Sequence, residues 1–486
     1  MSVDEFRLGG VTPVPWLSLS RLVALISLGG LGAVVMVAIV ITKSLLLVLV
    51  LGVLVGIFMM LARRRASDGG LWILKVGNTI RRWVGVRARW DDFDPEREEQ
   101  PFLILGPFRV VGVPAGDGSE LGVLDDGRGM VVVLEVSGAP CGVMSDEQIN
   151  RWQEAWTDLH RELADPKTAL TQVDWLTLVR PEDPFNIAEQ IPDLIPGLPE
   201  EAVLSAVDLS FEVAACAEQQ FTYAVLRFDV DALYERFVRP PYTAASGAEG
   251  AYDATTRVAK LITGADAGIS VKSGLSPQEI SALIRAIVAP EYSPRNLDDC
   301  TGEIFQSCPA WKRDGGMLTV SSDNYEWWHM SASFGLEDWP RSPVSGRWLQ
   351  PLVFNPDLGC RTIVTQLRLV PTFRATEFAR SQLTTARSKA LQTDERGTID
   401  AGEAWSRERV ATEVAEDVVQ YGQVGIVPSV RILLTGTSQR GVRNQFEDLE
   451  SAVRSKARAD GITSDQARPG AALLRVLPLG LEVPAR

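Results

Sequence analysis

The spacing of hydrophobic positions changes several times along the chain, and each spacing predicts a different kind of element. From residue 22 to residue 62, Lys43 is the only charged side chain. The runs 22–42 and 44–62 are each about as long as the ~20 residues with which a helix crosses a bilayer. The pattern therefore predicts a membrane domain over residues 1–66, built as a hairpin of two transmembrane helices.

The second apolar run carries Gly52 and Gly56, separated by three residues. This spacing of small residues allows two membrane helices to approach closely. We therefore expect helix–helix packing at these two glycines, although membrane helices are rich in glycine in any case.

Residues 67–100 are expected to form a basic juxtamembrane collar followed by an acidic linker. Basic residues gather directly after the second apolar run, and positive charge marks the cytoplasmic side of a membrane segment. The pattern predicts a multi-pass protein of the cell membrane with both termini in the cytoplasm. Contact with membrane lipids is expected at Arg63, Arg64, Arg65, Arg81 and Arg82.

After residue 100 the chain alternates between strand-like and helix-like spacing. Ser145 and Ser276 each begin a capping box, and apolar residues then recur three and four positions apart, which predicts two helices. Further helices are expected over residues 204–217 and 252–263. Strands are expected over residues 221–230, 317–321, 325–334, 358–369, 429–435 and 473–477.

These patterns predict an α+β fold class. We expect an N-terminal two-helix transmembrane hairpin followed by cytoplasmic α/β-sandwich domains over residues 101–292 and 293–486. No internal repeat is visible in the sequence.

The amino-acid composition argues against several classes of protein. The 486 residues carry a net charge of −14, which disfavours a general nucleic-acid-binding surface, so no direct nucleic-acid partner is expected. Five scattered cysteines do not make a disulfide scaffold, and two histidines, His160 and His329, exclude a His-rich metal site.

The sequence does not contain a recognisable catalytic motif. The dipeptide Gly-Lys is absent, which excludes a Walker A loop, and neither H-E-x-x-H nor C-x-x-C occurs. We expect His329 to be a packing residue of a strand and His160 to lie exposed on the polar side of its helix. The sequence motifs therefore predict no enzyme, no cofactor, no catalytic residue and no metal ligand.

A local basic stretch leaves two interpretations open. It could bind a phosphate or an acidic partner, or it could pair with acidic side chains of this chain, which is the more frequent case. Its members are Arg368, Arg374, Arg380, Arg387 and Lys389.

Several short motifs carry a resemblance to a known family. They are Tyr325-Glu326-Trp327-Trp328-His329, Trp339-Pro340, Trp348-Leu349, Leu367-Arg368-Leu369-Val370-Pro371 and Val430-Arg431-Ile432-Leu433-Leu434-Thr435-Gly436. With the order hairpin, basic collar and acidic body, the chain resembles actinobacterial integral membrane proteins of conjugative, type IV-like secretion clusters. Residues 293–486 are similar to the non-catalytic N-terminal domain of conjugation ATPases.

The resemblance implies a non-catalytic inner-membrane adaptor subunit of a type IV-like conjugation or secretion apparatus. Its partners would be other secretion subunits, including a separate P-loop ATPase, and it could form an oligomer. A membrane subunit of a type VII secretion machine, a membrane-tethered enzyme acting on lipid-linked substrates, and a membrane-bound sensor or scaffold are the alternatives.

Overall fold

The computed structural model describes the greater part of the chain after residue 107. The described ranges are 108–116, 118–138, 145–181, 199–214, 218–238, 244–302, 311–322, 324–334, 349–370, 425–455 and 461–481, with single helical residues between 380 and 412. All of them belong to one compact unit.

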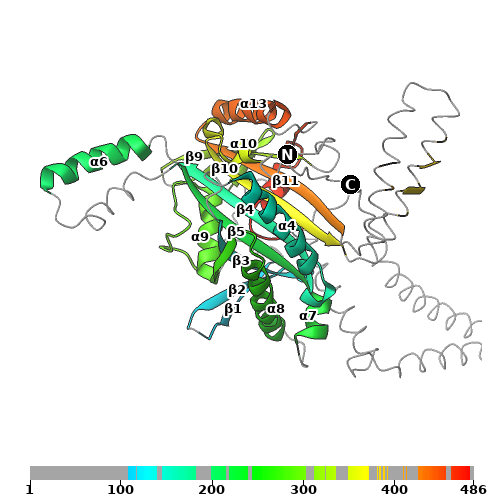
Figure 1. Ribbon diagram of the computed structural model, residues 1–486. Helices are drawn as coiled ribbons and strands as arrows, with labels where there is room; N and C mark the ends of the chain where they lie inside the picture. The colour runs from blue at the N-terminus through cyan, green and yellow to red at the C-terminus, as the bar shows by residue number, and fades with distance from the viewer. Residues whose placement is uncertain are drawn as a thin grey trace, which may run out of the picture. The chain divides into compact units, whose positions relative to one another are not determined.

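Twelve strands of the described residues form one sheet, in which every pairing is antiparallel (Figure 1). The strands of its first half are β1 (Arg109–Pro114), β2 (Glu120–Asp125), β3 (Gly129–Gly138), β4 (Leu170–Pro181), β5 (Glu218–Asp229) and β6 (Ile269–Gly274). Those of its second half are β7 (Trp311–Asp314), β8 (Met317–Ser321), β9 (Glu326–Phe334), β10 (Cys360–Val370), β11 (Gly425–Gly436) and β12 (Thr463–Ser464).

The expected fold class is wrong. A largely antiparallel sheet dominates the described residues, rather than sandwiches behind a transmembrane hairpin. The expected multi-pass membrane localisation is contradicted as well, because no helix in the described ranges is both long and apolar enough to span a bilayer. The runs 22–42 and 44–62, the collar and the linker lie outside the described residues.

The sheet repeats one topology twice, although no repeat is visible in the sequence. The strand order is β1-β2-β3-β5-β4-β10-β11-β9-β8-β7, so the second half reads as the first half in reverse. The two additional strands fit the same scheme, since β6 pairs with β3 and β12 pairs with β9. A pseudo-two-fold axis therefore passes between the adjacent strands β4 and β10.

The same local turn precedes both central strands. Asp165 and Asn355 each accept a hydrogen bond from the backbone N–H two residues later, and a proline follows each of them. One turn of 3₁₀ helix then ends at a residue of positive φ, Ala169 at 59° and Gly359 at 56°. β4 and β10 therefore correspond at an offset of 190 residues.

Strand register supports this correspondence. In the β4–β10 pair Trp175 lies opposite Thr365, and these are equivalent positions at the offset of 190. Leu226 pairs with Val132 and Val173, and Ile432 pairs in the same way with Ala332 and Ile363. The two halves therefore have equivalent hydrophobic positions on their outer face.

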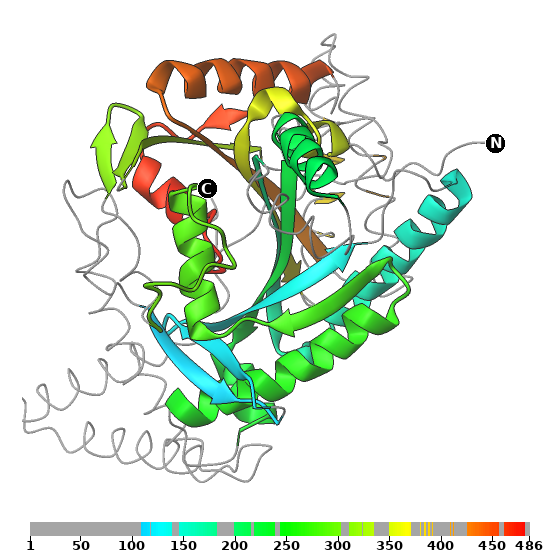
Figure 2. The ribbon, with the colours of Figure 1, turned by 90° about the vertical axis from the view of Figure 1, so that its left-hand side faces the viewer.

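Helices cover both faces of the curved sheet (Figure 2). The outer face of the first half is covered by α4 (Asp146–Leu163), α8 (Ala244–Gly264) and the short α7 (Val230–Arg236). The outer face of the second half is covered by α13 (Gln439–Ser455) and α10 (Gln350–Val353). The sheet curves around α9 (Pro277–Val288) and α14 (Pro469–Leu474) on the inner face.

The helix starts confirm two sequence predictions. Ser145 caps α4 and Ser276 caps α9, each in a complete capping box. The expected strand over residues 473–477 is wrong, because Pro469 begins α14 there. A further helix, α6 (Glu200–Ala214), lies between β4 and β5.

Candidate functional site

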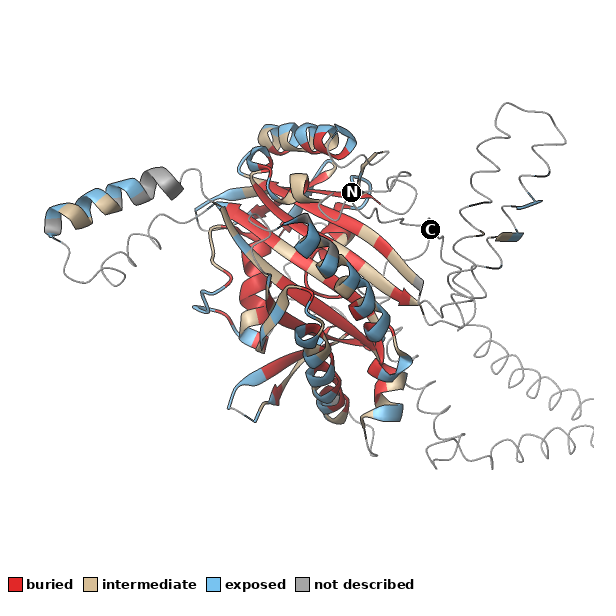
Figure 3. Cartoon of the chain, viewed as in Figure 1, coloured by how far each residue is buried: buried red, intermediate tan, exposed pale blue. Residues whose placement is uncertain are grey.

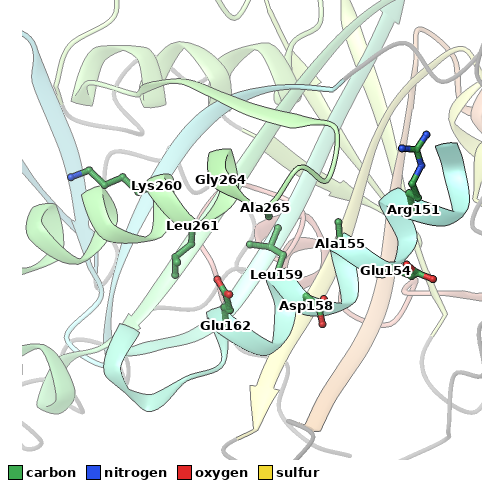
Figure 4. A pocket seen from close by; sticks show the side chains of 10 residues that line it. All are labelled: Arg151, Glu154, Ala155, Asp158, Leu159, Glu162, Lys260, Leu261, Gly264 and Ala265. Atoms are coloured by element: carbon green, nitrogen blue, oxygen red, sulfur yellow. The ribbon is translucent and has the colours of Figure 1, made fainter.

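A surface groove lies between α4 and α8 (Figure 4). Its volume is about 460 Å³. Ten residues line it: Arg151, Glu154, Ala155, Asp158, Leu159, Glu162, Lys260, Leu261, Gly264 and Ala265.

The spacing of hydrophobic residues in α4 explains why one side of this helix forms a wall of the groove. Trp156, Leu159 and Leu163 recur at helical spacing and pack against the sheet. Glu154, Asp158 and Glu162, four positions apart, therefore form a row along the exposed side of the helix. The helix thus presents three carboxylates along one edge of the groove.

The wall on α8 is mainly apolar and small. Leu261, Gly264 and Ala265 face α4 across the groove, and Leu159 and Ala155 complete an apolar floor. Figure 4 shows the carboxylate of Glu162 in the gap, while Lys260 extends away from it. A row of acidic side chains beside an apolar floor is complementary to an amphipathic helix that carries basic residues.

Part of the acidic row is already paired within α4. Arg161 donates to Asp158 at 2.6 Å, and both side chains are exposed. Glu154 and Glu162 are also exposed, and the described structure shows no ion pair for them. These two carboxylates are therefore the most direct contacts for a positively charged ligand.

His160 lies close to the groove but is not exposed, contrary to the sequence prediction. Its ring stacks on Trp156 at 5.1 Å, and Trp156 packs edge-on against Trp175 at 4.9 Å. Burial lowers the pKa of His160 to about 4, so the ring is neutral at pH 7. It stabilises the packing of α4 on the sheet.

His329 is a packing residue, as the sequence predicts. It is 1% exposed in β9, and its Nδ1 atom lies 3.0 Å from the hydroxyl of Thr435 on β11. Burial lowers its pKa to about 4. Within the described ranges, no three His, Cys, Asp or Glu side chains are grouped as metal ligands would be.

A polar cluster lies on the inner face of the sheet at the pseudo-two-fold axis, formed by the buried Gln172, Asp174 and Gln366 and the half-buried Ser429. Gln172 donates to both carboxylate oxygens of Asp174 at 2.9 Å. Gln366 donates to the carbonyl of Leu481 at 3.2 Å and accepts from Ser429 at 3.4 Å. The cluster therefore ties the chain end near residue 481 to the central strands.

Burial raises the pKa of Asp174 to about 7. Hydrogen bonds from Gln172 and Gln366 and the charges of Arg431 and Arg227 lower it, but the cost of removing the carboxylate from water is larger. No local signal in the sequence distinguishes this residue, because its strand has an ordinary alternating pattern.

The residues predicted from the sequence are not brought together at the groove. Gly52, Gly56 and the five arginines of the predicted lipid contact lie outside the described residues. Of the basic stretch, Arg368 lies in β10, and Arg380 and Arg387 are exposed and helical. The signal that could have revealed the groove is the spacing of Glu154, Asp158 and Glu162.

Comparison with known proteins adds no assignment to this geometry. No known protein family matches the chain, and no curated protein shows significant similarity to it. The function therefore has to be argued from the groove and from the sequence motifs.

Proposed function

We propose that the chain is a non-catalytic adaptor that binds a basic, amphipathic segment of a partner protein in the groove between α4 and α8. The observation that supports this function best is the row Glu154, Asp158 and Glu162 beside the apolar floor. The carboxylates attract and orient a basic partner, and burial of its apolar residues against Leu159 and Leu261 supplies affinity.

The sequence motifs suggest which partner to test first. The resemblance to type IV-like conjugation and secretion proteins makes a separate P-loop ATPase of such an apparatus our first candidate. An adaptor of this kind holds the ATPase in place, and it needs a binding surface rather than a catalytic site.

A defined peptide tests the groove directly. The probe is a synthetic helical peptide with leucines at helical spacing and lysines on the opposite face, and fluorescence anisotropy measures its binding to the full chain. We expect binding that weakens at least about tenfold in E154K/E162K, because two attractive contacts become repulsive. The same peptide with glutamate in place of lysine should not bind.

The matched control is E447K/D448K, which reverses two exposed charges on α13, far along the chain from the groove. It changes the net charge by the same amount, so an effect of net charge alone would weaken both variants equally. Equal weakening, or no effect of E154K/E162K, would refute the groove as the binding surface.

The choice of partner has a separate test. A tagged P-loop ATPase from the same secretion cluster is co-purified with the wild-type chain and with E154K/E162K. We expect recovery of the wild-type chain and at least about tenfold less of the variant. If the peptide binds and the ATPase does not, the groove is retained and the secretion assignment is rejected.

A further inference from the structure

The charged wall of the groove changes sign along its length. Its charged residues on α4 are three or four positions apart, so they lie in one row: Arg151, Glu154, Asp158 and Glu162. All four are exposed, and Figure 3 shows exposed residues along the outer side of this helix. The row therefore begins with one positive charge and continues with three carboxylates.

The two ends of this row are well separated. At 1.5 Å per residue, Arg151 and Glu162 are about 16 Å apart along the helix axis. Figure 4 shows them at opposite ends of the α4 wall. The separation exceeds the screening length of ~8 Å at physiological ionic strength, so a ligand meets the two ends as separate charges.

Three charges of the row have no ion pair in the described part of the chain. Asp158 accepts a hydrogen bond from Arg161 at 2.6 Å, which offsets its charge locally. The structure shows no ion pair for Arg151, Glu154 or Glu162. The charges that the row offers to a ligand are therefore positive at Arg151 and negative at Glu154 and Glu162.

The wall on α8 adds no competing charge. Leu261, Gly264 and Ala265 are uncharged. Lys260 also lines the groove, but its side chain extends away from the gap (Figure 4). The electrostatic pattern that a ligand meets in the groove is therefore that of the α4 row.

We propose that the groove prefers a helix with segregated charges, which carries one acidic residue near an end and basic residues further along. This inference rests on the proposed function, because it concerns the segment that the groove binds. The acidic residue of the ligand contacts Arg151, and its basic residues contact Glu154 and Glu162.

Arg151 is then the residue that determines specificity. A uniformly basic helix places a like charge against it, which weakens binding of that helix relative to the segregated one. Two helices that lie side by side rise equally per residue. We therefore expect the acidic residue of the ligand three or four positions from its first basic residue and about 11 positions from its second.

Three peptides test this preference by fluorescence anisotropy with the full chain. The first is the lysine peptide already described. The second has glutamate in place of one terminal lysine, and the third has glutamate in place of one central lysine, so these two have the same net charge. We expect the terminal-glutamate peptide to bind the wild type at least about fivefold more tightly than the central-glutamate peptide.

Variants of Arg151 identify the residue responsible. R151E should bind the lysine peptide at least about fivefold more tightly than the wild type does, and the terminal-glutamate peptide at least about fivefold more weakly. R151K retains the charge and should bind all three peptides as the wild type does. The matched control is K260E, which makes the same change in net charge and should leave the ratio between the two glutamate peptides unchanged.

Two results would overturn this preference. One is equal affinity of the wild type for the two glutamate peptides, and the other is an equal effect of R151E and K260E on their ratio. In both cases the lysine peptide would still bind, so the proposed function would stand. Failure of every peptide to bind the folded wild type, as judged by circular dichroism, would refute the groove and this inference together.

Discussion

The two halves of the sheet share one topology but differ in the helices on their outer face. The first half carries α4 and α8, of 18 and 21 residues, side by side. The second half carries the 17-residue α13, while α10 has only four residues. The groove lies on the first half, where these two long helices form its walls.

The comparison extends to single positions of the two central strands. At the offset of 190 residues, Thr171 corresponds to Arg361, and Asp174 corresponds to Val364. The repeated topology therefore fixes where the strands lie and does not fix the polarity of each position. At each of these two pairs a charged residue belongs to one half only, so variants at equivalent sites can measure the difference in stability.

The largest difference in free energy of unfolding is expected between variants at the equivalent positions Arg361 and Thr171. Arg361 is 1% exposed, and its guanidinium donates to both carboxylate oxygens of Glu218 at 2.8 and 2.9 Å. It also donates to the carbonyls of Leu352 and Gly359. R361A leaves these acceptors without a donor, so we expect a loss of about 3–5 kcal/mol in the free energy of unfolding.

T171A is the matched control for R361A. Thr171 makes one hydrogen bond, to the carbonyl of Arg227 at 3.1 Å, so we expect a loss of about 1 kcal/mol. Urea denaturation followed by circular dichroism measures both values. Equal losses would show that the ion pair of Arg361 contributes no more than an ordinary hydrogen bond.

The next difference concerns how the free energy of unfolding depends on pH. It is expected at Asp174, whose equivalent position in the second half is occupied by the apolar Val364. The folded-state pKa of about 7 lies above the value of about 3.8 in the unfolded chain. Between these pH values the folded protein holds a proton that the unfolded chain has lost. Stability from this group is therefore full below pH ~4 and is lost as the pH rises to ~7.

D174N removes this titration, so it should remove most of the fall in the free energy of unfolding between pH 4 and 8. The neutral histidines His160 and His329 have the opposite dependence, because their lowered pKa values make stability rise over part of the same range. The difference between wild type and D174N isolates the carboxylate, measured as urea denaturation across the pH series. Parallel curves would show that Asp174 is ionised throughout.

Local signals in the sequence predicted many elements well. The capping box at Ser276 and the strand Met317–Ser321 were predicted at the correct residues, because each depends on neighbouring side chains. The run 473–477 was misjudged, since a short apolar run does not distinguish a strand from a buried helix. The proline at position 469 begins α14 and was the signal that favoured a helix.

The repeat and the groove could not be predicted by local reasoning. Equivalent positions such as Asp174 and Val364 share neither size nor charge, so the repeat is visible only in strand order and register. The groove joins Glu154 to Leu261, which are far apart in the sequence and meet because both helices pack on the same sheet face. Only long-range pairing supplies that information.

The smallest difference between the halves is expected at two exposed ion pairs. Arg161 contacts Asp158 on α4, and Arg454 contacts Glu450 on α13, each at 2.6 Å. Both arginines are solvent-exposed, so the solvent screens the attraction and side-chain entropy opposes it. We expect R161A and R454A each to change the free energy of unfolding by no more than about 0.5 kcal/mol. Urea denaturation measures both variants. A loss of free energy of unfolding above about 1 kcal/mol in R161A alone would show that the ion pair of Arg161 and Asp158 stabilises α4 more than an ordinary exposed pair does.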